Sequence, residues 1–207
     1  MPLIVCLIGL MIGFSLRSKV NNVIDFECKW INYYPWIQAV VYLLLFFKFN
    51  VSLDLIKYSF LICLLIPLAI IDQYTRYIYT LPIIIGGGVA LLLASLNGNL
   101  SEVVLGGMIG FITISIIMKL SNEGLGEGDR DLITLCGLFL GLRATGFMIL
   151  LSFVIGALVT VYLSLRRRIS LSDELAFAPF ICIATMITVL FQDELINIYV
   201  KMLHYLI

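Results

Sequence analysis

The sequence predicts an all-α membrane protein, a polytopic bundle of about eight transmembrane helices. Of its 207 residues, 62% are hydrophobic and only 13% are charged, whereas a soluble domain carries about 25% charged residues. The apolar residues fall into separate runs, most of them close to the roughly 20 residues that a helix needs to cross a hydrocarbon core of about 30 Å. Because no hydrophilic stretch is long enough for a second domain, residues 1–207 are expected to form one integral-membrane domain.

The first two expected spans are residues 2–16 and 33–48. No basic residue precedes the first run and no A-x-A-like cleavage site follows it, so this run is expected to be retained rather than removed as a signal peptide. The second run opens on the aromatic residues Tyr33, Tyr34 and Trp36, which are typical of a membrane interface. A short loop, residues 17–32, connects the two spans.

Six further runs complete the predicted bundle: 56–73, 78–96, 100–119, 130–143, 146–165 and 175–192. Glycines four residues apart, as in Gly106/Gly110 and Gly137/Gly141, predict places where helix backbones approach closely. The remaining residues, 193–207, alternate apolar and charged side chains and are expected to lie along the membrane surface as an interfacial tail.

The basic residues favour one orientation of this bundle in the cell membrane. With the N-terminus outside, nine of them lie on the cytoplasmic side and four outside, in agreement with the positive-inside rule. The nine are Arg17, Lys19, Lys29, Arg76, Lys119, Arg130, Arg166, Arg167 and Arg168; the four are Lys48, Lys57, Arg143 and Lys201. Both the end of span 56–73 and the start of span 130–143 then face the cytoplasm.

Composition also limits the classes of partner and cofactor. Thirteen basic residues balance thirteen acidic ones, so no basic field indicates a nucleic-acid partner. The five cysteines are far apart and form no CxxC pair, and the one histidine, His204, has no second metal ligand near it in sequence. We therefore expect no metal site and no cofactor. Membrane lipid is the one partner that the composition itself implies.

Two acidic positions are candidates for a functional site. Asp72 ends one apolar run, and Asp129 closes the turn Gly126-Glu127-Gly128-Asp129 at the start of another. An acid at bilayer depth costs roughly 2.5 to 3.5 kcal/mol on insertion scales, which makes it a site hypothesis. Two carboxyl groups a few ångströms apart share one proton, so one can activate water while the other donates to a peptide carbonyl, as in aspartic proteases.

The residues around Asp129 fit this chemistry, although each has a structural alternative. Without Cβ atoms, Gly126 and Gly128 would let a substrate backbone approach closely. Glu127 and Asp131 would attract a basic segment at low ionic strength, or they are solvated loop charges. Asp129 is equally suited to cap its helix, since Asp is a preferred N-cap residue.

In these motifs the sequence resembles the type IV prepilin peptidases, intramembrane aspartyl proteases with a Gly-x-Gly-Asp signature. Asp72 follows Ala69-Ile70-Ile71 and precedes Leu81-Pro82, and the Gly126–Asp129 turn is followed by Leu132 and the glycines 137 and 141. The segment Ala176-Phe177-Ala178-Pro179-Phe180 resembles the family's apolar-Pro-Phe stretch. The resemblance implies that Asp72 and Asp129 are catalytic and that Pro179 and Phe180 contact substrate.

The chain departs from the family pattern at three places. Ile78 is followed by Tyr79-Thr80 where the family carries Pro-Asn or Pro-Asp, and Asp131 stands where the family has lysine. The loop 17–32 contains Cys28 alone, whereas longer family members carry paired CxxC motifs implicated in zinc binding and in methyl transfer. The resemblance therefore implies cleavage without methylation, with neither zinc nor S-adenosylmethionine.

The implied substrate is a prepilin-like membrane protein, a pilin or pseudopilin, whose short basic leader is removed at the cytoplasmic face. Two other interpretations remain open. A presenilin-like or signal-peptide-peptidase-like protease would pair the turn with Tyr-Asp and Pro-Ala-Leu, but Ile71 precedes Asp72 and no Pro-Ala-Leu occurs. A proton-coupled carrier would use the aspartates as a relay, with acids deeper in its helices. No residue in the sequence determines the oligomeric state.

Overall fold

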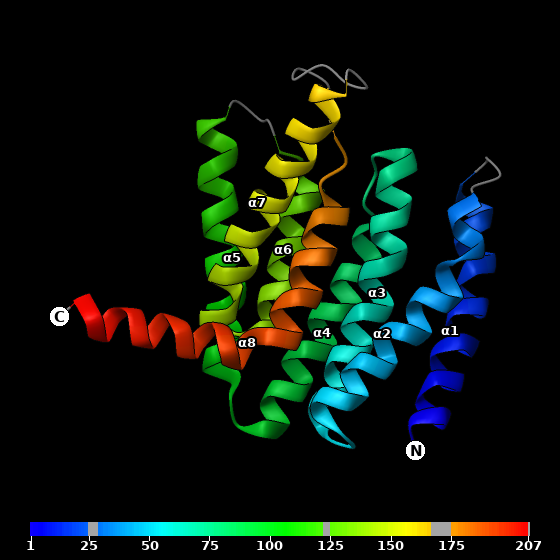
Figure 1. The fold of residues 1–207 in the computed structure, drawn as a ribbon, viewed down its shortest axis with the longest axis horizontal. Helices are drawn as coiled ribbons and strands as arrows, with labels where there is room; N and C mark the ends of the chain where they lie inside the picture. The colour runs from blue at the N-terminus through cyan, green and yellow to red at the C-terminus, as the bar shows by residue number, and fades with distance from the viewer. Residues whose placement is uncertain (25–28, 122–124, 167–174, 207) are drawn as a thin grey trace.

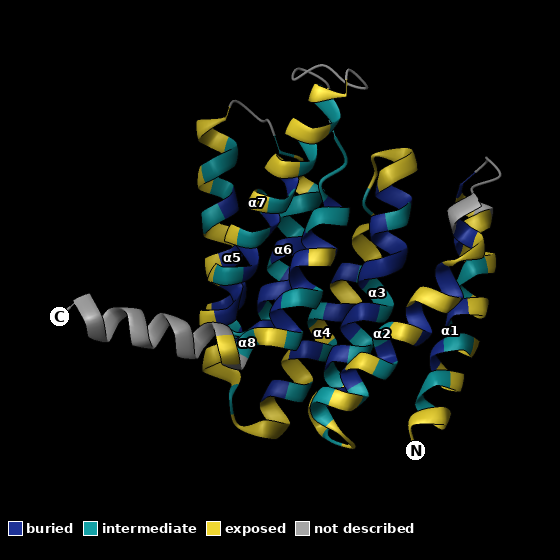
Figure 2. Ribbon diagram, viewed as in Figure 1, coloured by how far each residue is buried: buried dark blue, intermediate teal, exposed yellow. Residues whose placement is uncertain are grey.

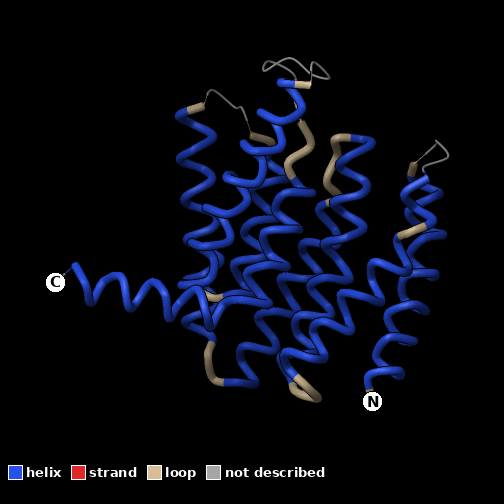
Figure 3. Tube along the Cα trace, viewed as in Figure 1, coloured by secondary structure: helices blue, strands red, loops and turns tan. Residues whose placement is uncertain are grey.

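A computed structural model of the 207-residue chain describes residues 1–24, 29–121, 125–166 and 175–206. These residues form eight α-helices and one short 3₁₀ helix, with no strand among them, which confirms the expected all-α class (Figures 1 and 3). The helices are α1 (Pro2–Val23), α2 (Tyr34–Phe49), α3 (Leu53–Thr75), α4 (Thr80–Asn97), α5 (Leu100–Leu120), α6 (Glu127–Leu140), α7 (Leu142–Leu165) and α8 (Ala178–Leu206).

Five helices of the described chain are long and apolar enough to cross a membrane. The five segments are Pro2–Asn21, Leu53–Thr75, Thr80–Asn97, Leu100–Leu120 and Leu142–Leu165, and two shorter apolar helices are Tyr34–Phe49 and Ala178–Gln192. Large apolar side chains are also exposed along α1, α4, α5 and α7, and Figure 2 shows exposed positions of the ribbon in yellow. A helical bundle with this surface is suited to lipid rather than water.

Helix α6 is the shortest of the eight and lies at the centre of the bundle (Figure 1). Its 14 residues extend for only about 21 Å at 1.5 Å per residue, which is less than the bilayer core. Its buried residues point in several directions around the helix: Leu132, Ile133, Leu135, Cys136, Gly137, Phe139 and Leu140. Other helices therefore shield α6 from lipid.

Glycine contacts bring α5 and α6 together. A Cβ atom on Gly106 would collide with the carbonyl oxygen of Gly137, and one on Gly137 would collide with the carbonyl oxygen of Gly106. A similar contact joins α1 to α2, where a Cβ on Gly13 would lie 2.6 Å from the Cα of Pro35. The glycine pairs in the sequence thus pack helices within one chain.

Several helices extend beyond the predicted spans. Helix α1 continues from the expected end at residue 16 to Val23, so the first part of the 17–32 connection is helical. The reason is that Val20 and Ile24, four residues apart, are buried in a small cluster with Ile31 and Ile71. Cys28 lies outside the described residues. Helix α8 runs through to Leu206, so residues 193–206 are helical, and their place along the membrane surface stays a prediction.

The helix ends are arranged so that α3 finishes where α6 and α8 begin. Helix α3 starts at the N-cap Ser52, whose hydroxyl accepts the N–H of Leu55 over 3.2 Å, and ends at Arg76 in a left-handed conformation with φ of 53°. Its end lies at the top of the view in Figure 1, opposite the N-terminus of the chain. This top end of the bundle carries the candidate site.

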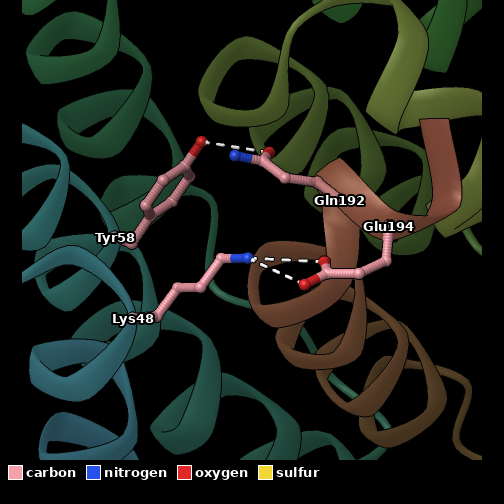
Figure 4. A network of polar contacts seen from close by, with 4 residues as sticks. All are labelled: Lys48, Tyr58, Gln192 and Glu194. Carbon is pink, nitrogen blue, oxygen red and sulfur yellow. Dashed lines mark hydrogen bonds and ion pairs between the residues drawn. The ribbon is translucent and has the colours of Figure 1, made fainter. Parts of the chain in front are cut away.

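At the opposite end, polar contacts join α8 to α2 and α3 (Figure 4). Lys48 forms an ion pair with Glu194 with an N–O distance of 3.3 Å, and the Tyr58 hydroxyl donates to Gln192 Oε1 over 3.5 Å. These contacts hold the middle of α8 against the bundle.

Candidate active site

One cavity of about 340 Å³ opens at the top end of the bundle. The residues that line it come from the end of α3, the α3–α4 connection and the start of α6: Asp72, Arg76, Tyr77, Ile78, Thr80, Gly126, Glu127, Gly128, Asp129 and Asp131. The two candidate acids, which are 57 positions apart in sequence, therefore share one cavity.

Asp72 lies in the last turn of α3, and only 5% of its surface is exposed. Its Oδ2 accepts the backbone N–H of Ala178 over 3.1 Å. Ala178 is the first residue of α8, and the residue before it, Phe177, has no side-chain acceptor that could cap the helix. Asp72 thus supplies the missing acceptor for a helix N-terminus, whose dipole also favours a negative charge.

Asp129 lies in the first turn of α6. Its Oδ2 accepts the N–H of Gly126 over 3.3 Å, while its own N–H donates to the Gly126 carbonyl over 3.1 Å. Its Oδ1 is buried and has no hydrogen-bond partner in the described part of the chain. Asp129 lies outside the candidate membrane spans, and burial, followed by the negative charge of Asp72, raises its pKa to about 7.

The two acids have different hydrogen-bond partners. Asp72 accepts an N–H from a helix N-terminus, a contact that stabilises a carboxylate. Asp129 has one unpaired buried oxygen and a pKa near neutrality, which favours the protonated acid. A pair divided in this way can act as base and acid in one reaction.

The two glycines of the turn have different surroundings. A Cβ on Gly126 would lie 3.4 Å from the Oδ2 of Asp129 and 4.0 Å from the nitrogen of Gly128, whereas a Cβ on Gly128 would lie 2.8 Å from the Cβ of Ile78. Ile78 therefore occupies the space beside Gly128. Close approach of a substrate backbone to these glycines stays a prediction, with Gly126 the more open of the two.

Glu127 and Asp131 both line the cavity. Asp131 is held by Arg130, with N–O distances of 3.0 Å from both Nε and a terminal guanidinium nitrogen. Arg130 in turn lies over the ring of Phe111, 4.9 Å from its centre. Asp131 is thus a paired surface charge at the cavity edge, and its role toward substrate stays a prediction.

Pro179 and Phe180 do not line the cavity. Phe180 packs on α7, where a Cβ on Gly156 would lie 3.2 Å from its ring, and it stacks edge-on with Phe177. The segment nevertheless reaches the site through its backbone, because the N–H of Ala178 contacts Asp72. Substrate contact by Pro179 and Phe180 stays a prediction.

Sequence reasoning did not single out Arg76, Tyr77, Ile78 and Thr80 as cavity residues. They form the wall between α3 and α4. Their position could have indicated them, since they lie between Asp72 and Leu81-Pro82, in a segment that departs from the family pattern. Within the described residues, no three His, Cys, Asp or Glu side chains are grouped so that they could hold a metal ion.

Comparison with known proteins connects this site to a family. Residues 59–161 match the model of the type IV leader peptidase family, a range that includes Asp72 and Asp129 but ends before α8. A prepilin leader peptidase/N-methyltransferase of Bacillus subtilis (strain 168) is 29% identical over 161 residues, which are 75% of this chain and 63% of the relative. No solved structure matches the chain.

Two further prepilin leader peptidase/N-methyltransferases match over shorter stretches. The protein of Pseudomonas putida is 38% identical over 46% of this chain and 35% of its own length, and that of Aeromonas hydrophila is 32% identical over 58% and 43%. The matches thus span between about a third and two thirds of these relatives. The chain is a multi-pass membrane protein, and it belongs to the type IV leader peptidase family.

Proposed function

We propose that this protein is an intramembrane aspartic endopeptidase that removes the short basic leader from prepilin-like substrates at the cytoplasmic face of the cell membrane. The observation that carries the proposal is the cavity lined by both Asp72 and Asp129. Family membership supports the peptidase activity, and the different environments of the two acids in one cavity support the aspartic type.

In the proposed reaction, the carboxylate of Asp72 takes a proton from a water molecule as its oxygen attacks the scissile carbonyl carbon. The protonated Asp129 donates its proton to the carbonyl oxygen, which gives a tetrahedral diol. Collapse of the diol returns a proton to Asp129, breaks the C–N bond and transfers the proton held by Asp72 to the leaving nitrogen. Both carboxyl groups regain their starting states, and the two acids alone carry every proton transfer.

The charge around the cavity supports a basic leader as substrate. Glu127 and Asp131 lie on its wall beside the two catalytic candidates, and an acidic, partly enclosed wall raises the local concentration of a basic peptide. The apolar outer surface gives the hydrophobic helix that follows the leader a lipid environment beside the site.

The test compares leader removal by the wild type, Asp72→Asn and Asp129→Asn in membranes that contain a leader-bearing prepilin-like substrate. Asp54→Asn is a matched control, because Asp54 is an exposed aspartate in the first turn of the same α3. We expect at least a 10³-fold loss of cleavage in the two site variants and none in the control. Cleavage that survives in both site variants at equal protein level would refute the proposal, and transport of protons would become the next activity to measure.

The cytoplasmic orientation rests on the nine basic residues expected on that side. Tyr77→Cys tests it, since Tyr77 is an exposed residue of the cavity wall. In a background without the native cysteines, a membrane-impermeant maleimide should label this variant in inverted membrane vesicles and not in intact cells. The reverse pattern would place the cavity outside.

Cleavage without methyl transfer is the last part of the proposal. It is supported by the 17–32 segment, which contains one cysteine and no CxxC pair. Incubation with substrate and methyl-labelled S-adenosylmethionine should give a cleaved product that carries no label. A labelled product would show that the chain methylates without that motif.

A further inference from the structure

The connection between α3 and α4 is held firmly although it is only four residues long. The chain leaves α3 at Arg76, whose backbone has a left-handed conformation with φ of 53°. The N–H of Arg76 donates to the carbonyl of Asp72 over 2.8 Å. The hydroxyl of Thr75 donates to the carbonyl of Ile71 over 2.9 Å and accepts the N–H of Tyr77 over 3.3 Å. The path of the chain after Asp72 is therefore fixed by local hydrogen bonds.

Ile78 is the residue of this connection whose side chain packs into the protein interior. Its neighbours Tyr77 and Tyr79 are 58% and 39% exposed and stack edge-on with ring centres 5.1 Å apart. Ile78 is half-buried and packs against the main hydrophobic core. Its side chain also lies against the bare Cα of Gly128, where a Cβ would be 2.8 Å from the Cβ of Ile78 and 3.3 Å from its Cδ1.

This contact joins the two elements that carry the acids. Ile78 follows Asp72 by six residues through a fixed connection, and Gly128 directly precedes Asp129. A shift of Ile78 relative to Gly128 would therefore change the separation of the two carboxyl groups across the cavity. Ile78 itself offers no group that can exchange a proton.

We propose that Ile78 is a positioning residue, whose packing on Gly128 sets the distance between Asp72 and Asp129 that catalysis requires. The proposal rests on the protease function proposed above. It gives Gly128 a role inside the protein, since any side chain at this position would push Ile78 and the α3–α4 connection away from the turn. A misplacement of about 1 Å in such a site can lower the rate about 10²-fold.

The first test measures geometry and needs no substrate. Gln73 and Glu127 are exposed and lie one and two positions from Asp72 and Asp129 in sequence, so spin labels on Gln73→Cys and Glu127→Cys report the separation of α3 and α6. In a background without native cysteines, we expect Ile78→Ala to broaden or lengthen the inter-label distance, while Ile78→Val, which keeps both γ carbons, leaves it unchanged.

Leu138→Ala is the matched control. Leu138 also packs on a glycine across a helix contact, with a Cβ on Gly107 only 2.6 Å from its Cδ2. It lies nine residues beyond Asp129, about 13 Å along α6, so its loss should lower stability without changing the inter-label distance. If Ile78→Ala leaves the distance distribution like that of the wild type, the proposal is overturned.

The second test measures cleavage of the prepilin-like substrate. Ile78→Ala should lower kcat about tenfold or more and change KM less than about threefold, with Ile78→Val near the wild type. A rise in KM alone would make Ile78 a substrate contact and would overturn the positioning role. Should the wild type itself fail to cleave, the protease function is refuted, while the label distances still decide whether Ile78 sets the separation of the acids.

Discussion

The backbone N–H of Ala178 donates to Oδ2 of Asp72 over 3.1 Å, although the two residues are 106 positions apart in sequence. Asp72 is therefore both a candidate catalytic acid and the acceptor that completes the first turn of α8. The contact explains how the Ala176–Phe180 segment reaches the site even though the Phe180 side chain packs on Gly156. A substitution of Asp72 can act on chemistry, on the start of α8, or on both.

Two variants of Asp72 should separate these roles. Asn keeps a side-chain oxygen that can accept the Ala178 N–H, so Asp72→Asn should abolish cleavage with little loss of stability. Ala removes the acceptor, so Asp72→Ala should lose cleavage and also about 1 kcal/mol of stability, the usual effect of a missing cap. Thermal unfolding in detergent measures the difference, and equal stability of the two variants would contradict the capping role.

Cleavage should fall as the pH rises through about 7. Burial and the charge of Asp72 raise the pKa of Asp129 to about 7, and the proposed reaction needs Asp129 protonated. In the pH profile of kcat, the rate should therefore decrease on the alkaline side near neutral pH. The control variant Asp54→Asn should show the same decrease. A profile that is flat up to pH 9 would contradict the assignment of Asp129 as the acid.

The same shift makes a prediction for stability. Because the pKa of Asp129 is higher in the folded state than the ordinary value of about 3.9, its stabilising contribution is full below about pH 4 and is lost as the pH rises through about 7. Asp129→Asn does not titrate, so its melting temperature should fall less between pH 5 and pH 8 than that of the wild type. An identical fall in both proteins would contradict the burial of the charge.

Gly137→Ala should destabilise the protein by about 1 to 3 kcal/mol, the range for overpacking, because its methyl group would collide with the carbonyl of Gly106. Gly146→Ala is the control, since a Cβ there would have no atom of the described residues within 4 Å apart from its own stretch of helix. Alanine there should be neutral or stabilising by up to about 1 kcal/mol. Urea or thermal unfolding of the two variants gives the comparison.

Glu127→Gln should weaken binding of a basic leader mainly at low salt. The side chain is exposed at the cavity, and interactions of exposed charges are screened over about 10 Å at 0.1 M salt. KM should rise a few-fold at low ionic strength and approach the wild-type value at high salt, with kcat unchanged. Glu194→Gln, at the opposite end of the bundle, should leave KM unchanged at every salt concentration.

The fold class and the approximate helix positions could be predicted from the sequence because they depend on local hydrophobicity. Helix ends were harder to predict, since α1 continues to Val23 only because Val20 and Ile24 find Ile71 on another helix. From the charge pattern and the number of spans, we predicted that Asp72 and Asp129 lie at the same end of the bundle. In the structure, both residues line one cavity. Their catalytic role stays a prediction.

The contacts that organise the site could not be predicted from sequence. Ile78 and Gly128 are 50 positions apart, and Asp72 and Ala178 are 106 apart. Each contact depends on how α3, α6 and α8 pack. Gly128 and Ala178 have no side-chain group that would mark them in the sequence as partners of Ile78 and Asp72. The sequence predicted substrate approach at Gly128, which stays a prediction, but it did not indicate that Ile78 packs beside this glycine.

The backbone contact between Gly106 and Gly137 limits how far α5 and α6 can move relative to each other. Two helices that touch main chain to main chain have little freedom to slide, so α5 and α6 should act as one stiff base that carries Asp129. The turn that carries Asp129 would then be a fixed reference, against which Ile78 and the end of α3 are placed.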